Sequence, residues 1–342
     1  MKKILGRTLA LAGGPLFAAT LFVAPANAAP ALNDPPPISA DEPLSAIQAL
    51  SPESLETTAA AVSTTDSAAA YSTEGASVTV PWDASHGAVV AGDHVELRVQ
   101  LPFAEQTSNG VVLESGVTAF DNGNASKTVP VAHEDGSLQI LTVIESANAP
   151  TRYDYEISVP EGGAMTVIES GVVLITDAAG KFVGGVAPAW ARDAAGNELS
   201  TSYEVKGNTL TQVIDHSAAV EYPVVADPWL GIKLFQNFSR TKEQGDWRYG
   251  AWVTPLGAVI LGGGGGVGGY VAGQAVFRGA GWDEWKAIWS EVSNKPTLQQ
   301  QYNCHVAASV YGLPFTQDYN LERFRANRDN WVNGIQSHHC NW

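Results

Sequence analysis

Two cysteines, each beside a histidine, are the residues of this sequence best suited to chemistry: Cys304-His305 and His338-His339-Cys340. Such residues can form a zinc site, a catalytic cysteine–histidine pair or a disulfide. Paired zinc ligands are usually separated by about two to five residues, whereas adjacent side chains diverge on a helix or strand. An even number of cysteines in an exported chain usually pairs. We therefore expect a Cys304–Cys340 disulfide, with zinc and a reactive thiol as the alternatives.

Four polar residues near these cysteines form a candidate functional cluster: His305, His338, His339 and Arg325. A secreted hydrolase would use Arg325, His338 or His339, while His305 falls on the apolar stripe of a predicted helix, where a histidine usually belongs to the core. The chain has no G-x-S-x-G, H-E-x-x-H, phosphate-loop or calcium-loop motif. We assign no catalytic residue, no metal ligand and no cofactor.

The segment 256–277, "LGAVILGGGGGVGGYVAGQAVF", contains the spacing G-x-G-x-x-G at Gly263, Gly265 and Gly268. A dinucleotide site also needs a βαβ unit with an acid at the end of its second strand, and Asp283 instead falls in a predicted helix. The segment is long enough to cross a bilayer, and its G-x-x-x-G pairs could pack helices there. Its many glycines contribute no apolar side chain and weaken a helix. We therefore favour a glycine-rich loop or a loosely packed helix inside the domain, and membrane insertion is the alternative.

Residues 1–28 have the form of a secretory signal peptide. Lys2, Lys3 and Arg7 precede an uncharged apolar run, and Ala26-Asn27-Ala28 matches a cleavage site. We expect cleavage after Ala28 and an extracellular protein; an uncleaved membrane anchor is the alternative. Removing three positive charges changes the net charge from −16 to −19. An acidic chain of this kind disfavours nucleic acid as a partner.

Composition and periodicity divide the rest of the chain into three parts. Residues 29–75 are rich in Ala, Ser, Thr and Pro and predict a disordered linker, with a short helix near 44–50. Residues 76–228 show short runs of period two separated by Gly, Asn and Asp turns, which predict an acidic, antiparallel β-sandwich-like domain. Residues 229–342 hold eight of the ten tryptophans and predict a small α+β domain. The fold class is multidomain α+β.

Two helices are expected in this last domain. Trp282, Trp285, Trp289 and Val292 lie on one helical face, and a second helix runs through "TLQQQYNCHVAASVYG". The tryptophans most often form core in such a pattern. A carbohydrate- or partner-binding aromatic surface is the other interpretation.

Two stretches resemble known secreted proteins. Residues 171–228, "GVVLITDAAGKF…VVADP", resemble a β-rich module of secreted actinobacterial proteins that precedes variable C-terminal domains. The tail resembles an actinobacterial C-terminal domain of unknown function, through Gln301-Tyr302-Asn303-Cys304-His305, Tyr319-Asn320-Leu321-Glu322 and the final cysteine. The resemblance implies export and a modular architecture and supplies no activity.

The sequence thus favours a non-catalytic extracellular binding or interaction module with a cell-surface ligand or extracellular partner. A secreted effector or bacteriocin-like toxin acting on membranes through residues 256–277 is the first alternative. A secreted hydrolase is the second.

Overall fold

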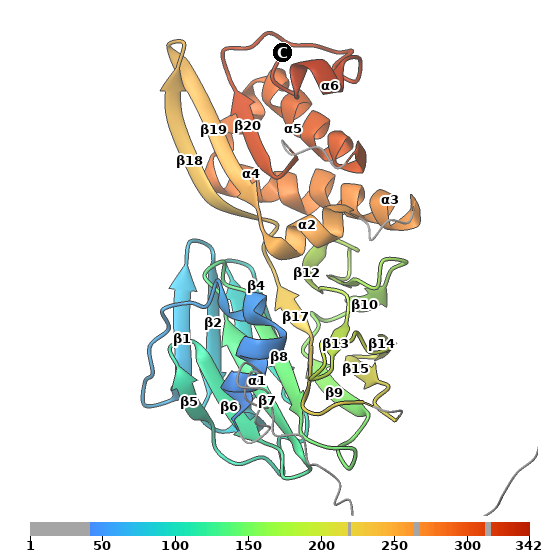
Figure 1. Cartoon of the computed structure of the whole chain (residues 1–342). Coiled ribbons are helices and arrows are strands. Elements are labelled where there is room, and N and C mark those ends of the chain that lie inside the picture. Colours follow the sequence, from blue (N-terminus) through green and yellow to red (C-terminus); the bar gives the residue numbers. More distant parts are fainter. Residues whose placement is uncertain (1–41, 218–219, 263–266, 312–315) are drawn as a thin grey trace, which may run out of the picture. The chain divides into compact units, whose positions relative to one another are not determined.

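The structure is a computed structural model that describes residues 42–217, 220–262, 267–311 and 316–342. The predicted signal peptide and residues 29–41 of the predicted linker lie outside these ranges. The N-terminal part of the described chain consists of two antiparallel sheets, and the C-terminal part combines a small sheet with helices (Figure 1). The multidomain α+β class with a sandwich-like first domain is confirmed.

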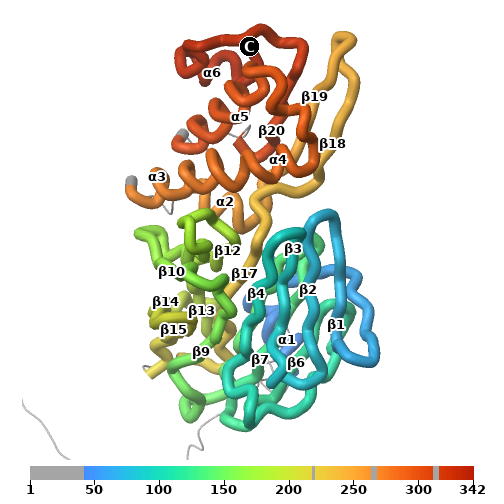
Figure 2. The backbone as a smooth tube through the Cα atoms, turned by 180° about the vertical axis from the view of Figure 1, so that it is seen from behind, coloured from blue at the N-terminus to red at the C-terminus, as the bar shows by residue number. Residues whose placement is uncertain are grey.

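The first sheet has seven strands in the order β1-β2-β3-β4-β9-β15-β14, and its first four strands follow one another in the chain (Figure 2). Its strands are β1 (Ser67–Thr73), β2 (Ala76–Pro81), β3 (Ala88–Gly92), β4 (Val95–Gln100), β9 (Arg152–Ile157), β14 (Thr201–Lys206) and β15 (Thr209–Ile214).

The second sheet has ten strands, eight of them in the order β10-β11-β12-β17-β8-β7-β6-β5, with β16 pairing β8 and β13 pairing β16. Its strands are β5 (Val111–Glu114), β6 (Val117–Asp121), β7 (Ser126–Ala132), β8 (Leu138–Ile144), β10 (Ala164–Val167), β11 (Val173–Thr176), β12 (Phe182–Val186), β13 (Trp190–Arg192), β16 (Val224–Asp227) and β17 (Trp229–Gly231).

The side-chain alternation of the strands builds the core between the sheets. In β9, Tyr153, Tyr155 and Ile157 are buried while the intervening residues are exposed, as the period of a strand with one solvated face requires. The β8 strand is buried on both faces, because α1 (Pro43–Leu50) packs over the outer face of its sheet.

The predicted disorder of residues 29–75 is wrong for the part of that range that the structure describes. Ala46, Ile47 and Leu50 of α1 are buried against the ten-stranded sheet, and β1 is an edge strand of the seven-stranded sheet. The short predicted helix is confirmed. The composition misled because alanine contributes little apolar bulk alone, yet it fits closely between a sheet and its covering elements.

The carboxyl of Asp227 is buried inside the sandwich. The Gln139 amide donates a 2.7 Å hydrogen bond to Asp227 Oδ2, and the Tyr203 hydroxyl donates to the Asp227 backbone carbonyl. Asp227 is 1% exposed. Burial raises the pKa of its carboxyl to about 7 because the charged form loses its water.

In the described residues of the C-terminal part, a three-stranded antiparallel sheet is accompanied by five α-helices (Figure 1). The strands are β18 (Phe235–Glu243), β19 (Asp246–Val253) and β20 (Asp318–Glu322), and the helices are α2 (Pro255–Gly262), α3 (Val267–Val276), α4 (Trp282–Ile288), α5 (Pro296–Ala308) and α6 (Ile335–His338).

The predicted domain boundary at 228/229 falls inside the sandwich. Strand β17 pairs with both β8 and β12 in the ten-stranded sheet. The buried cluster of the C-terminal part also includes Val172, Leu174 and Phe182, which pack with Leu256 and Ile260 of α2. The two parts therefore share apolar packing.

The glycine-rich segment contributes α2, α3 and the π-helical turn Phe277–Gly281, with residues 263–266 outside the described ranges. A Cβ at Gly273 would lie 2.0 Å from the Ile260 carbonyl oxygen, so the absence of a side chain lets α3 approach α2 closely. Among the described residues, no helix is long and apolar enough to cross a membrane.

The tryptophans are mostly packed. Trp285 is fully buried and Trp282 nearly so, and Trp289 follows the last residue of α4 in an extended conformation, so the helix ends earlier than the pattern predicts. Trp331 and Trp342 pack on the disulfide. Trp252 differs from these, since its side chain is 50% exposed.

Candidate functional site: a polar cleft beside β20

The two cysteines are joined. Cys304 on α5 and Cys340 after α6 form a disulfide with their Cα atoms 5.5 Å apart. Cys304 points away from the Leu298–Tyr302–Val306 stripe and packs with Ala308 and Ile335. The bond fastens the last residues of the described chain to α5, and it confirms the predicted pairing over zinc and a free thiol.

A polar cleft of about 460 Å³ lies where these last residues meet the small sheet. Strands β19 and β20 supply most of its lining, and Gln317 before β20, α5 and the tail supply the rest. The lining residues are Arg248, Trp252, His305, Gln317, Asp318, Asn320, Glu322, His339 and Asn341.

Strand period explains why these side chains share a face. Tyr249 and Ala251 of β19 are buried, as are Tyr319 and Leu321 of β20. The intervening residues therefore face the other way. The antiparallel register places Arg248 opposite Glu322, Gly250 opposite Asn320, and Trp252 opposite Asp318.

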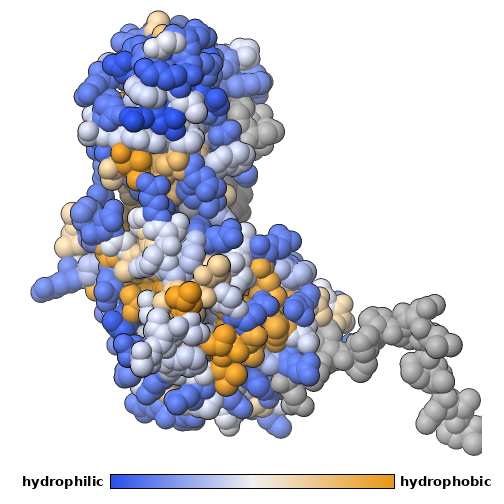
Figure 3. Space-filling model, turned by 90° about the vertical axis from the view of Figure 1, so that its left-hand side faces the viewer, coloured by the Kyte–Doolittle hydropathy of each residue, from blue (hydrophilic) through white to orange (hydrophobic). Residues whose placement is uncertain are grey.

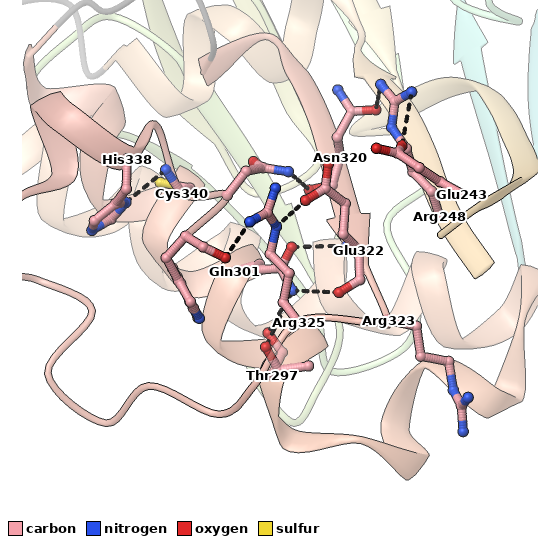
Figure 4. A network of polar contacts seen from close by, with 12 residues as sticks. Glu243, Arg248, Thr297, Gln301, Asn320, Glu322, Arg323, Arg325, His338 and Cys340 are labelled. Atoms are coloured by element: carbon pink, nitrogen blue, oxygen red, sulfur yellow. Dashed lines mark hydrogen bonds and ion pairs between the residues drawn. The ribbon is translucent and has the colours of Figure 1, made fainter. Parts of the chain in front are cut away.

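Arg248 is held in place by its neighbours. Its guanidinium donates a 2.6 Å hydrogen bond to Asn320 Oδ1 and lies 3.8 Å from a Glu243 carboxylate oxygen (Figure 4). A Cβ at Gly250 would lie 2.8 Å from Ser239 Oγ and 3.4 Å from Asn320 Oδ1. Glycine at this position thus leaves the space that the Ser239 side chain occupies, and Asn320 Oδ1 lies just beyond it.

The edge of β20 is covered by a buried amide. Gln301 of α5 accepts from the Glu322 backbone N–H at 2.8 Å and donates to the Glu322 carbonyl at 3.0 Å. Its Nε2 also donates to the Thr297 carbonyl. The Gln301 side chain therefore substitutes for a neighbouring strand and fixes the end of β20 against the helix.

Arg325 ties the tail to β20. Its guanidinium forms an ion pair with the Glu322 carboxylate and donates to the Trp342 backbone carbonyl (Figure 4). The neighbouring Arg323 pairs with Asp246 at 3.0 Å. The Trp247 backbone N–H, together with Arg323, holds the pKa of the Asp246 carboxyl below its usual value.

The candidate cluster from the sequence divides into two pairs. His305 and His339 both line the cleft; His305 is buried with its ring stacked 4.6 Å from that of Tyr319, and His339 is exposed. Arg325 lies beneath the cleft and engages Glu322. His338 accepts from the Cys340 backbone N–H and its other ring nitrogen contacts the Trp331 carbonyl, so it supports the tail.

Sequence reasoning did not place seven of the lining residues in a site: Arg248, Trp252, Gln317, Asp318, Asn320, Glu322 and Asn341. The available signal was the alternation in "DWRYGAWV" and "DYNLE", where bulky apolar residues take every second position. Their convergence could not be foreseen, because it depends on pairing between strands separated by more than 60 residues.

The lining of the cleft combines hydrogen-bond donors and acceptors with one half-exposed indole. Among its described lining residues, none carries a hydroxyl, thiol or amine nucleophile. Asp318 and Glu322 lie four residues apart on one strand, which separates their Cα atoms by about 13 Å. Glu322 is also occupied by Arg325.

Within the described residues, no group of three or more His, Cys, Asp or Glu side chains is arranged to hold a metal ion. Comparison with known protein families, curated proteins and solved structures finds no match to this chain.

Proposed function

We propose that the protein is a non-catalytic extracellular binding module that holds a carbohydrate in the polar cleft beside β20. The observation that carries the proposal is the half-exposed indole of Trp252 beside Asp318, with Asn320, Arg248 and Asn341 in the same cleft. The extracellular location rests on the predicted leader, and the disulfide is compatible with it.

A sugar offers the chemistry that this lining complements. Its rings have an apolar face, which suits an exposed indole, and its hydroxyls both donate and accept hydrogen bonds. Asp318 supplies acceptors, Arg248 supplies donors, and Asn320 and Gln317 supply both. Mixed linings of this kind fix the orientation of a ligand through a few polar groups around an apolar contact.

The test is a titration of the purified protein with oligosaccharide panels that include extracellular glycans, followed by calorimetry on those that bind. Trp252→Ala is expected to weaken binding at least tenfold, about 1.4 kcal/mol. Trp247→Ala is the matched control, since Trp247 lies on the same strand, does not line the cleft and stacks with Arg240 and Lys242. Equal binding by Trp252→Ala and the unmodified protein would overturn the proposal.

The two alternative functions give different results in the same experiment. Shortening of a bound oligosaccharide, detected by mass spectrometry, would indicate a hydrolase instead. Release of dye from anionic vesicles would indicate the membrane-acting effector.

A further inference from the structure

A second cleft, of about 290 Å³, shares no lining residue with the polar cleft. Three turns of the sandwich contribute Glu74, Asp93 and Asp177, and the residues after β17 contribute Ile232 and Lys233. Helix α4 closes it with Asp283, Glu284, Ala287 and Ile288.

The floor of this cleft is apolar. Phe182, Val183 and Ile232 face it from the sandwich side, and Phe238 and Ile288 face it from the C-terminal side. Its volume is at the lower end of small-molecule sites. The space fits a short aliphatic chain better than a polymer or a folded partner.

The rim of the cleft is acidic. Five carboxylates and two lysines line the cleft, a formal charge of −3 with His94 neutral and all five carboxylates ionised, and of −2 when Glu284 is protonated. Lys181 pairs with Asp283 at 2.7 Å, and Lys286 pairs with the other oxygen of the same carboxylate. Lys233 Nζ donates to the backbone carbonyl of Glu74, so this hydrogen bond does not involve the Glu74 carboxylate.

Glu284 is fixed differently from the other acids. Its two carboxylate oxygens accept from the backbone N–H groups of Leu234 and Phe235 at 2.9 and 3.0 Å, and so hold α4 to the start of β18. Burial raises the pKa of this carboxyl to about 7. Asp177 is half-buried, and its Oδ1 accepts from the backbone N–H groups of Ala179 and Lys181. Glu74 and Asp93 are the exposed acids of the cleft.

From the apolar floor and the excess of negative charge at the rim, we infer that this cleft binds a primary alkylammonium ion, with its chain on Phe182, Ile232 and Ile288 and its cation beside Glu74 and Asp93. The complementarity is of two kinds. The chain removes apolar surface from water at about 25 cal/mol per Å², and the ammonium meets carboxylates near a low-dielectric wall. This inference does not depend on the proposed carbohydrate site.

The experiment is calorimetry on the full chain with octylammonium, octanol and octanoate, at low and physiological salt. Octylammonium is expected to bind at least tenfold more tightly than octanol, to weaken with salt, and to raise the melting temperature. Octanoate is expected not to bind.

Variants separate the two contributions. The double change Glu74→Gln with Asp93→Asn is expected to remove most of the preference of octylammonium over octanol. Glu105→Gln with Glu134→Gln, two exposed acids outside the cleft, is the matched control. Ala287→Trp, at an exposed position on α4, is expected to block all three compounds. Circular dichroism verifies that each variant is folded.

Three results would overturn the inference. These are equal affinity for octylammonium and octanol, an unchanged preference in the Glu74/Asp93 variant, or undiminished binding in a folded Ala287→Trp variant. Loss of oligosaccharide binding in the Trp252→Ala variant bears only on the other site.

Discussion

Trp252 and Asp318 are directly opposed cross-strand neighbours in the β19–β20 ladder, and both line the polar cleft. Trp252 supplies an apolar indole ring and Asp318 supplies a carboxylate that accepts hydrogen bonds. The two residues lie on adjacent strands of a sheet whose other face is buried. Their spacing is set by backbone pairing, and the Gln301 amide and the Arg325 ion pair secure the far end of β20. The site is therefore pre-organised by the fold.

The disulfide is expected to stabilise the C-terminal part. Changing both Cys304 and Cys340 to Ala removes a cross-link across 36 residues, worth about 4 kcal/mol by the chain-entropy relation. Urea unfolding followed by tryptophan fluorescence measures the difference. Hydrogen exchange is expected to show the tail around His338 and Trp342 opening first. An unchanged unfolding midpoint would contradict the prediction.

The buried carboxyl of Asp227 makes stability depend on pH. Its pKa is about 7 in the folded protein and 3.8 in an unperturbed aspartate. The folded state therefore binds more protons between these values, so the free energy of unfolding falls as pH rises through that window. Asp227→Asn should remove the contribution of Asp227 to this fall, leave that of Glu284, whose pKa burial also raises to about 7, and retain the acceptor for Gln139.

Urea unfolding at pH 4 and pH 8 checks the Asp227 prediction. From pH 4 to pH 8 the variant is expected to gain a few kcal/mol relative to the unmodified protein. Asp93→Asn, at an exposed position, is expected to show no such gain. Parallel pH profiles for the Asp227→Asn variant and the unmodified protein would show that Asp227 titrates normally.

The close approach of α2 and α3 depends on one glycine. Gly273→Ala is expected to destabilise the protein by about 1–3 kcal/mol, because the new Cβ would collide with the Ile260 carbonyl. Gly279→Ala is the matched control, since its Cβ would meet nothing within 4 Å. Thermal unfolding compares the two. Equal melting temperatures of the Gly273→Ala and Gly279→Ala variants would contradict the prediction. They would show that α2 and α3 can move apart without loss of stability.

The limits of the sandwich predict which fragments fold. Residues 76–228 lack the edge strand β1 and the strand β17, which joins β12 to β8. A fragment of residues 42–232 is expected to unfold cooperatively, and residues 76–228 alone are not. Calorimetry of both fragments provides the test. A cooperative transition in the shorter one would show that neither strand is required.

The sequence predicted those features that depend on local pattern. Period two identified the sandwich strands, the four-residue repeat identified the stripe of α5, and the even cysteine count identified the disulfide. The prediction of disorder for residues 42–75 failed because β1 pairs with the next strand, β2, and because α1 packs on strands of the ten-stranded sheet that lie far along the chain.

The polar cleft was predicted only in part, for a related reason. His305 and His339 attract attention because they flank the cysteines, and both line it. Trp252 looks like the other tryptophans in sequence, and only the register with β20 shows that its neighbours on that face are polar and leave it exposed. Arg325 and His338 are side-chain types that often occur in functional sites. In this structure, however, their hydrogen bonds hold the tail in place.

The most direct test of the carbohydrate-binding account is a two-dimensional ¹⁵N NMR titration that follows the tryptophan indole N–H signals as an oligosaccharide is added. The account predicts that the Trp252 signal and the amide signals of Asn320 and His339 shift together and saturate at one ligand concentration, while the Trp247 signal stays in place. Saturable binding that leaves the Trp252 signal unmoved would contradict it.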